Sequence, residues 1–201
     1  LAVIAENTWY AFRAAEALEV EWLAPDYPAS STEMWQALSD ARTDEFRNSR
    51  LRDDGDVETA LNGATVIEAE YRAPFLAHAA LEPLCATVLV EADSVTIWTA
   101  TQIPAVVRDA AVETTGVDPA RVKLHVLPAG GSFGRRRDHD YVVQAIQVAA
   151  SMPGTPIKTT WSREEDMPHD FPRPLHMAVG RGTVADGRVL AYALDSVSPS
   201  L

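Results

Sequence analysis

The sequence has almost no cysteine. Cys85 is the single one among 201 residues, so it cannot close a disulfide within the chain and cannot anchor an iron–sulfur cluster alone. We interpret Cys85 as a small buried apolar side chain. The number of cysteines therefore does not indicate whether the protein works in a reducing or an oxidising compartment.

Positive charge and long apolar runs are also scarce. The chain has 17 Lys and Arg residues against 29 Asp and Glu residues, which gives a formal net charge of -12. A surface this acidic repels phosphate backbones, so no nucleic-acid partner is expected. No apolar run approaches the roughly 20 residues needed to span a bilayer, so no membrane segment is expected in this chain.

Both ends are interpreted as cuts in a longer chain. The sequence starts at Leu1 rather than at a methionine, and residues 1–5 lack the basic leader that opens a signal peptide. The other end follows a Ser-Pro-Ser stretch abruptly. The compartment, cytoplasmic or periplasmic, stays open.

The apolar content, 47%, and the charged content, 23%, are ordinary for a globular chain of one large or two small domains. Short apolar runs and period-two alternation predict strands at 1–5, 20–23, 65–72, 85–91, 95–99, 122–126, 157–161, 177–184 and 189–196. Helical spacing predicts helices at 8–19, 33–38, 103–115 and 138–150. Because the strands and helices do not alternate strictly, the predicted fold class is α+β with a mixed sheet.

A change of composition divides the chain. Residues 24–63 contain prolines at 25 and 28 and a charge-rich stretch at 43–56, which is typical of a solvated connector. We therefore expect residues 1–23 and 64–201 to pack as separate units.

The sharpest local motif is Gly-Gly-Ser-Phe-Gly-Arg-Arg-Arg at residues 130–137, between a predicted strand and a predicted helix. Its glycines allow a positive φ and a close approach of backbone N–H groups to a ligand, and three arginines add positive charge. The motif fits an anion or cofactor cradle, or a tight turn with solvated arginines. It matches neither a P-loop nor a dinucleotide fingerprint.

Two further segments could carry chemistry. His78 and Glu82 stand ahead of a proline and could form an acid/base pair, but a structural hydrogen bond is the preferred interpretation. Gln102 follows a predicted strand, at the position where ligand crevices open in sheets with helical connections. Glu164, Glu165 and Asp166 are expected in the first turn of a helix capped by Ser162, and the five histidines show no zinc spacing.

Taken in order, four motifs resemble the molybdenum-binding region of the xanthine dehydrogenase family. They are Leu81-Glu82-Pro83, Thr101-Gln102, Gly130–Gly134, and the Arg-Glu-Glu-Asp-Met segment at 163–167. The resemblance covers nearly the whole chain and is weakest over 24–60. Four motifs in the family's order are far more specific than any one of them.

The resemblance implies a domain organisation. Residues 1–23 would be the C-terminal part of an α/β hammerhead-like domain, residues 24–63 a connector, and residues 64–201 the first part of a mixed-sheet molybdopterin-binding domain. The implied cofactor is molybdopterin, as molybdenum cytosine dinucleotide, in the full-length protein. The implied cofactor-binding residues are Gln102, Gly130, Gly131, Ser132, Phe133 and Gly134, and no residue of this chain is expected to ligate the metal.

The resemblance also implies an oxidoreductase that hydroxylates a carbon of an N-heteroaromatic compound or an aldehyde with oxygen from water, with a small [2Fe-2S] subunit as partner. Arginines at 135–137 resemble the branch that holds the large chain of isoquinoline 1-oxidoreductase and the membrane-bound aldehyde dehydrogenases. Purine-oxidising members have a glutamate at the place of Arg137, so a purine is not expected.

Some family features are absent or changed. Ser132 replaces a glycine, and Leu81 replaces a frequent methionine. The family's catalytic glutamate, in a Gly-x-Gly-Glu motif, does not occur in this sequence. No catalytic residue is therefore expected within this chain, which should be inactive alone. Two other interpretations stay open: a non-catalytic anion-binding α+β module built on Arg135–Arg137, and a scaffold that docks the iron–sulfur subunit.

Overall fold

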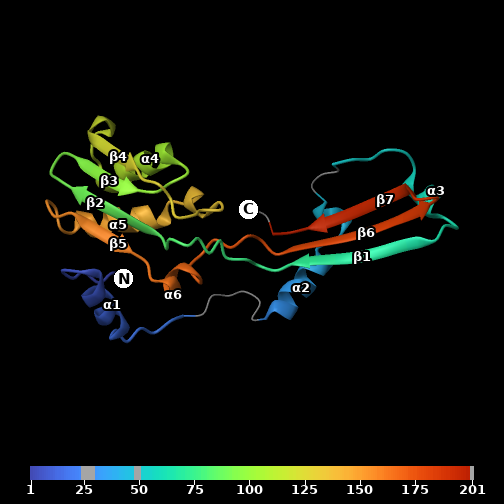
Figure 1. The fold of residues 1–201 in the computed structure, drawn as a ribbon, viewed down its shortest axis with the longest axis horizontal. Helices are drawn as coiled ribbons and strands as arrows, with labels where there is room; N and C mark the ends of the chain where they lie inside the picture. The colour runs from blue at the N-terminus through green and yellow to red at the C-terminus, as the bar shows by residue number, and fades with distance from the viewer. Residues whose placement is uncertain (24–29, 48–50, 200–201) are drawn as a thin grey trace. The chain divides into compact units, whose positions relative to one another are not determined.

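The computed structural model describes residues 1–23, 30–47 and 51–199. The chain divides into two compact units (Figure 1): unit 1 comprises residues 1–21 and 77–172, and unit 2 comprises residues 22–76 and 173–201. Helices and strands are mixed in both, which confirms the α+β class. Residues 1–21 group with 77–172, so the expectation that 1–23 and 64–201 pack as separate units is wrong. The assignment of 1–23, 24–63 and 64–201 to family domains stays a prediction, and the prolines at 25 and 28 lie outside the described residues.

Unit 1 is built on a four-stranded mixed sheet. Its strands are β2 (Cys85–Val90), β3 (Val95–Thr99), β4 (Val122–Val126) and β5 (Ile157–Thr160), in the order β4-β3-β2-β5. Strands β3 and β4 are parallel, and the other neighbours are antiparallel. The parallel pair is possible because a helix crosses between the two strands.

Two helices pack on the buried face of this sheet. The crossover helix α4 (Pro104–Thr115) begins at a proline and ends at Gly116, whose φ is +73°. Helix α5 (Asp140–Ala150) begins two residues later than the predicted 138. Alternate strand residues and one face of each helix form the core, which includes Val88, Ile97, Val107, Tyr141, Val142 and Ile146, each at most 1% exposed.

The start of unit 1 differs from the prediction. Helix α1 (Thr8–Glu16) forms and is capped by Asn7, whose side chain accepts from the Tyr10 N–H at 3.0 Å. The predicted strands at 1–5 and 20–23 are wrong, because neither segment has strand structure. A strand needs a hydrogen-bonded neighbour, and these apolar runs have none among the described residues.

Unit 2 is a three-stranded antiparallel sheet with short helices. Its strands are β1 (Val66–Ala73), β6 (His176–Ala185) and β7 (Arg188–Val197), in the order β1-β6-β7. The helices are α2 (Ser31–Asp40) and α3 (Val57–Leu61), with a 3-10 turn at Asp44–Phe46. Helix α3 follows the charge-rich stretch at 43–56, in a part of the region 24–63 where the sequence predicted only a connector.

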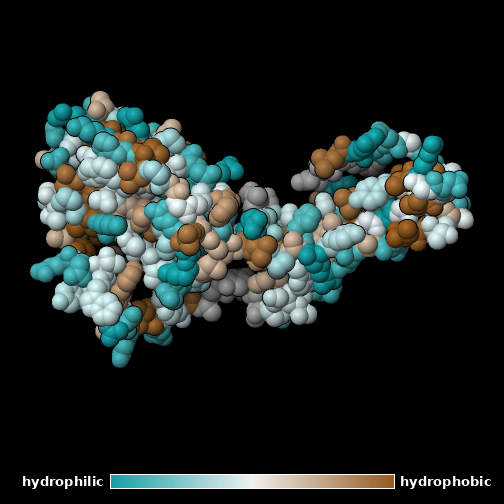
Figure 2. Space-filling model, in the orientation of Figure 1, coloured by the Kyte–Doolittle hydropathy of each residue, from teal (hydrophilic) through white to brown (hydrophobic). Residues whose placement is uncertain are grey.

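The core of unit 2 is small. Leu38 of α2 packs with Leu175 and Met177, and Met34, Trp35, Val179 and Val197 complete the cluster. On the other sheet face, large apolar side chains stay exposed: Ile67, Tyr71, Leu190, Tyr192 and Leu194. Figure 2 shows brown, hydrophobic residues at the molecular surface. Across the described residues, no helix is both long and apolar enough to cross a membrane.

Candidate functional site

The glycine turn and the Thr-Gln motif lie at one edge of the unit 1 sheet. Thr101-Gln102 follows β3, and residues 130–134 follow β4 after a short loop. Because β3 and β4 are parallel neighbours, both segments leave the sheet at the same end. The Ser132 hydroxyl donates to Gln102 Oε1 at 2.5 Å. The sequence-predicted residues Gln102 and Ser132 are therefore in direct contact.

The backbone of the turn is unusual. Gly131 and Gly134 have φ values of +100° and +111°, and the non-glycine Phe133 has φ +55°. The left-handed region is costly for a residue with a Cβ and is concentrated at ligand sites. Phe133 is 72% exposed, so it fills no core space. A role of Phe133 in binding the cofactor stays a prediction.

This conformation leaves a row of N–H groups free. Within the described part of the chain, the backbone N–H groups of residues 131–134 donate to no protein acceptor. Successive N–H groups at a turn with positive φ form a concave site for electron-rich oxygen or sulfur ligands. The donor set therefore fits a group that accepts several hydrogen bonds, as the oxygen-rich and sulfur-rich molybdopterin does.

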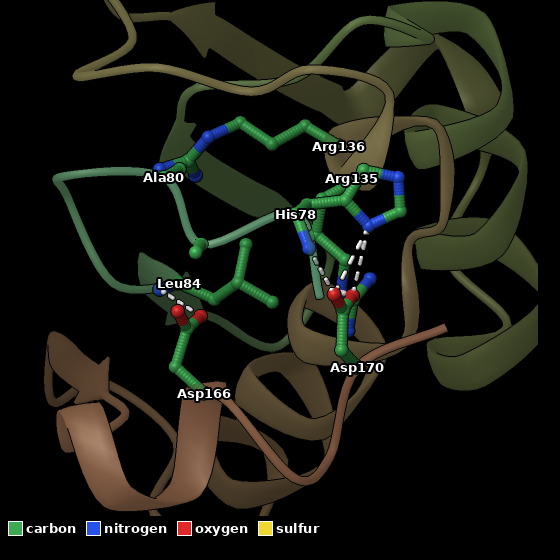
Figure 3. Close-up of a pocket in the computed structure, with 8 residues that line it drawn as sticks. His78, Ala80, Leu84, Arg135, Arg136, Asp166 and Asp170 are labelled. Atoms are coloured by element: carbon green, nitrogen blue, oxygen red, sulfur yellow. Dashed lines mark hydrogen bonds and ion pairs between the residues drawn. The ribbon is translucent and has the colours of Figure 1, made fainter. Parts of the chain in front are cut away.

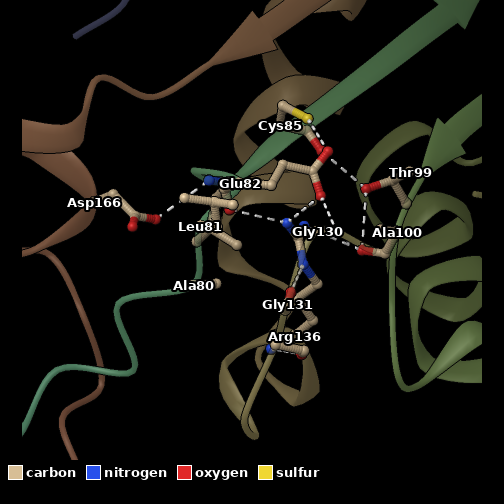
Figure 4. A network of polar contacts seen from close by, with 12 residues as sticks. Ala80, Leu81, Glu82, Cys85, Thr99, Ala100, Gly130, Gly131, Arg136 and Asp166 are labelled. Atoms are coloured by element: carbon tan, nitrogen blue, oxygen red, sulfur yellow. Dashed lines mark hydrogen bonds and ion pairs between the residues drawn. The ribbon is translucent and has the colours of Figure 1, made fainter. Parts of the chain in front are cut away.

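Glu82 fixes the start of the turn (Figure 4). The Gly130 N–H donates to Glu82 Oε2 at 2.9 Å, and the Glu82 N–H donates back to Gly130 O at 3.0 Å. A Cβ on residue 130 would lie 2.5 Å from Glu82 Cβ. Only glycine therefore fits at position 130 without displacing the Glu82 segment.

His78 and Glu82 do not form an acid/base pair. His78 instead meets Asp170, which accepts from its backbone N–H at 2.5 Å and lies 3.1 Å from its Nδ1. Glu82 bonds Gly130 and Arg136. Each side chain thus has its own partners, and these contacts join separate chain segments.

Two of the three arginines are buried, which corrects the expectation of an arginine-lined anion site or of solvated arginines. Arg135 is 3% exposed and Arg136 is 0% exposed, and only Arg137 is exposed. Buried guanidinium groups need carboxylate partners in the protein. Arg135 donates to both oxygens of Asp140 at 2.9 Å, and its Nε lies 2.9 Å from Asp170 Oδ1.

Burial alone would lower the pKa of Arg135, but the hydrogen bonds and charge of Asp140, with Asp170 and Asp138, raise it above its ordinary value. The guanidinium also lies over the rings of Trp161 and Phe171. Its Nε has the ion-pair distance to Asp170 without the angle of a hydrogen bond. Arg135 is therefore a fixed charge inside unit 1.

A small cavity lies beside this ion pair (Figure 3). It is lined by His78, Ala80, Leu84, both buried arginines and two aspartates. Its volume is about 10 Å³, which is the room for one water molecule. This cavity is too small for a cofactor, so the glycine turn remains the candidate site.

The Arg-Glu-Glu-Asp-Met segment holds the chain on both sides of Glu82 through hydrogen bonds. Helix α6 (Arg163–Asp166) is capped by Ser162, as predicted: the Ser162 hydroxyl accepts from the Glu165 N–H at 3.1 Å. Asp166 accepts from the Leu84 N–H at 3.2 Å. Arg163 donates to the carbonyls of Ala80 and Leu81 at 2.7 and 2.8 Å.

Sequence reasoning missed Asp170 and the bracing role of Arg163. Asp170 meets His78, and Arg163 donates to the Ala80 and Leu81 carbonyls, across more than eighty residues of the chain in each case. No periodicity or local motif reports such a pairing. Among the described residues, no group of three or more His, Cys, Asp and Glu side chains could hold a metal ion.

Residues 40–200 match the family model described as the molybdopterin cofactor-binding domain. The chain is 26% identical to a nicotinate dehydrogenase chain of Pseudomonas putida over 98% of this chain and 17% of that protein. It is 27% identical to the molybdenum-binding chain of the xanthine dehydrogenase of Escherichia coli O157:H7 over 98% of this chain and 27% of the relative. The chain thus spans about a quarter or less of these relatives.

A third relative, the beta chain of isoquinoline 1-oxidoreductase of Brevundimonas diminuta, is 32% identical over 49% of this chain and 12% of the relative. Two solved structures share the fold. A Cu,Mo-CO dehydrogenase matches 96% of this chain and 27% of its own with TM-score 0.70 and 17% identity. Quinoline 2-oxidoreductase from Pseudomonas putida 86 matches 70% of this chain and 18% of its own with TM-score 0.60 and 19% identity.

Proposed function

The chain belongs to the molybdopterin cofactor-binding domain family, and from this premise we propose that it holds part of the cofactor of a molybdenum hydroxylase at its glycine turn. The proposed contacts are Gln102, Gly130, Gly131, Ser132, Phe133 and Gly134. The observation that supports this best is the row of N–H groups at 131–134 without a protein acceptor, next to an exposed Gln102.

The residues have separate tasks in this proposal. The N–H groups at 131–134 donate hydrogen bonds to the cofactor's electron-rich atoms. The Ser132 hydroxyl holds Gln102 by its Oε1 at 2.5 Å, which leaves the amide NH₂ group to donate. Phe133 provides an apolar side chain at the site. These groups are fixed before any ligand arrives, which reduces the entropic cost of binding.

When bound, molybdopterin supplies the two-electron oxidation that places an oxygen from water on a substrate carbon. The protein's part is to orient the cofactor and to tune its electrostatics. We propose an N-heteroaromatic compound or an aldehyde as substrate, because several relatives carry such substrates in their names: nicotinate, isoquinoline and aldehyde. A cofactor in the cytosine dinucleotide form and a small [2Fe-2S] subunit complete the proposal, and the chain alone is expected to be inactive.

The first test is the composition of the protein expressed from its complete gene in a host that makes the cofactor. We expect molybdenum stoichiometric with the chain, a pterin, and cytidine monophosphate after acid hydrolysis. A co-purified [2Fe-2S] subunit would be visible in the absorption spectrum. Wild-type protein that folds but carries neither molybdenum nor pterin would show that the proposed function is wrong.

The second test is Gln102→Ala, with Gln147→Ala as the matched control. Both glutamines are exposed, but Gln147 lies in the middle of α5. Gln102→Ala should leave the fold intact and lower turnover about fivefold or more, the scale of one lost hydrogen bond at about 1 kcal/mol. Gln147→Ala should change nothing. Normal molybdenum content with unchanged turnover in Gln102→Ala would contradict its assignment.

A further inference from the structure

Arg136 stands where three motifs of the site meet, although it is not among the proposed cofactor contacts. Its side chain is 0% exposed and is the bulkiest of the fully buried ones in the described residues. A buried guanidinium is costly unless its N–H groups and its charge all find partners. The identity of those partners shows what Arg136 does.

The guanidinium joins three separate segments (Figure 4). Nη2 donates to Glu82 Oε2 at 2.8 Å and to Glu82 O at 3.2 Å. Nε donates to Gly131 O at 3.2 Å, inside the glycine turn. Nη1 makes a longer contact of 3.5 Å with Ala100 O, just ahead of Thr101-Gln102. Each nitrogen thus reaches a different carbonyl, and one of them also reaches the carboxylate.

The backbone of Arg136 continues the same connections. Its carbonyl accepts from the Gln102 N–H at 3.0 Å and from the Thr101 hydroxyl at 3.4 Å. Its N–H donates to the Ser132 hydroxyl at 3.3 Å, and that hydroxyl also holds the Gln102 side chain. Gln102 is therefore fixed at its backbone by Arg136 and at its side chain by Ser132.

We propose that Arg136 is a positioning residue, which holds Gln102 and the glycine turn in register so that their free donors converge on one ligand. That the positioned donors serve a cofactor rests on the proposed function. The contacts of Arg136 themselves do not depend on it. A lysine could meet the Glu82 carboxylate but could not reach three carbonyls at once, because an ammonium is a point charge without the planar fork of a guanidinium.

The neighbouring arginines provide matched controls. Arg135 is equally buried, but its partners are Asp140 and Asp170, away from the Glu82 and Gln102 segments. Arg137 is exposed, and its side chain contacts no partner in the described residues. Variants of these three consecutive arginines can therefore be compared. The comparison distinguishes the effect of losing a buried charge from the effect of losing the contacts that Arg136 makes.

The test is residue-resolved amide hydrogen exchange in the cofactor-free chain. The N–H groups of Glu82, Gln102 and Gly130 each have a partner at the junction. In Arg136→Met we expect these amides to exchange about tenfold faster or more, relative to the Val88 and Ile97 amides in the core, on the scale of losing hydrogen bonds to a charged group. Arg136→Lys should restore part of the protection.

Arg135→Met should lower the overall stability and leave the three amides unchanged relative to the core amides, and Arg137→Met should leave both unchanged. The proposal is overturned if the three amides follow the core amides in Arg136→Met, or if Arg135→Met accelerates them as much. If Arg136→Met does not fold, Arg136→Lys provides the same comparison. Wild-type protein without molybdenum would instead overturn the proposed function, so the two failures can be told apart.

Discussion

The two units bury their apolar side chains to different degrees. In unit 1, helices α4 and α5 cover one face of a mixed sheet, and residues such as Val88, Ile97 and Ile146 are fully buried. In unit 2, the buried cluster is Leu38, Leu175 and Met177, and one sheet face keeps large apolar side chains exposed. The candidate site belongs to the better-packed unit, which is where donors can be held in a fixed geometry.

The largest expected effect is the loss of core volume in unit 1. Ile146→Ala removes a side chain that is 0% exposed, so it should lower the free energy of unfolding by about 2–5 kcal/mol. Leu194→Ala in unit 2 removes a side chain that is 51% exposed and should cost about 0.5 kcal/mol or less. Urea denaturation of both variants measures the difference. Equal losses would contradict the contrast between the units.

A smaller effect separates two glycines that have ordinary φ values. Gly130→Ala places a Cβ 2.5 Å from Glu82 Cβ, so it should destabilise unit 1 by about 1–3 kcal/mol through overpacking. Gly180→Ala on β6 meets nothing closer than 3.6 Å and should be neutral or stabilising by up to about 1 kcal/mol. Thermal unfolding of the two variants measures this difference in stability. If Gly130→Ala does not lower the stability of unit 1, the Glu82 segment can move to make room for the added Cβ.

The smallest effect is a pH dependence at Cys85. Burial raises the pKa of this thiol above its ordinary value of 9.0, and the Glu82 carboxylate raises it further. The folded chain then keeps the proton to a higher pH than the unfolded chain. The thiol's contribution to stability is complete below about pH 9 and is lost as the pH rises through the raised pKa.

Wild type should therefore lose stability relative to Cys85→Ala as the pH is raised above about 9, measured by urea denaturation at several pH values. At neutral pH, folded wild type should also react more slowly with iodoacetamide than the urea-unfolded chain does. Reaction at equal rates would show that the fold does not shield the Cys85 thiol near Glu82. It would weaken the claim that unit 1 buries its side chains better than unit 2.

Local patterns predicted most of the elements. Period-two alternation located β1, and Pro104 and Gly116 bounded α4 because proline suits a first helical turn and glycine suits a left-handed end. The strands expected at 1–5 and 20–23 failed because an apolar run does not show whether a partner strand exists. Helix α3 was missed because its five residues are too short for a period to be seen.

The site residues were also predicted only in part. Gln102, Ser132 and the glycines were predicted because a resemblance and a turn motif are local in sequence. That Arg135 and Arg136 are buried could not be predicted, since a run of arginines on an acidic chain is typical of a solvated surface. Their fate depends on Glu82, Asp140 and Asp170, and two of these lie tens of residues away.

The central claim is that the N–H groups of residues 131–134 are kept free of protein acceptors in order to hold the cofactor. The most direct test is amide hydrogen exchange at these four positions in cofactor-loaded and cofactor-free protein. Without the cofactor they should exchange fast, and with it they should become protected, while the β6–β7 turn at Asp186-Gly187 in unit 2 stays unchanged. Equal exchange at residues 131–134 in both states would contradict the account.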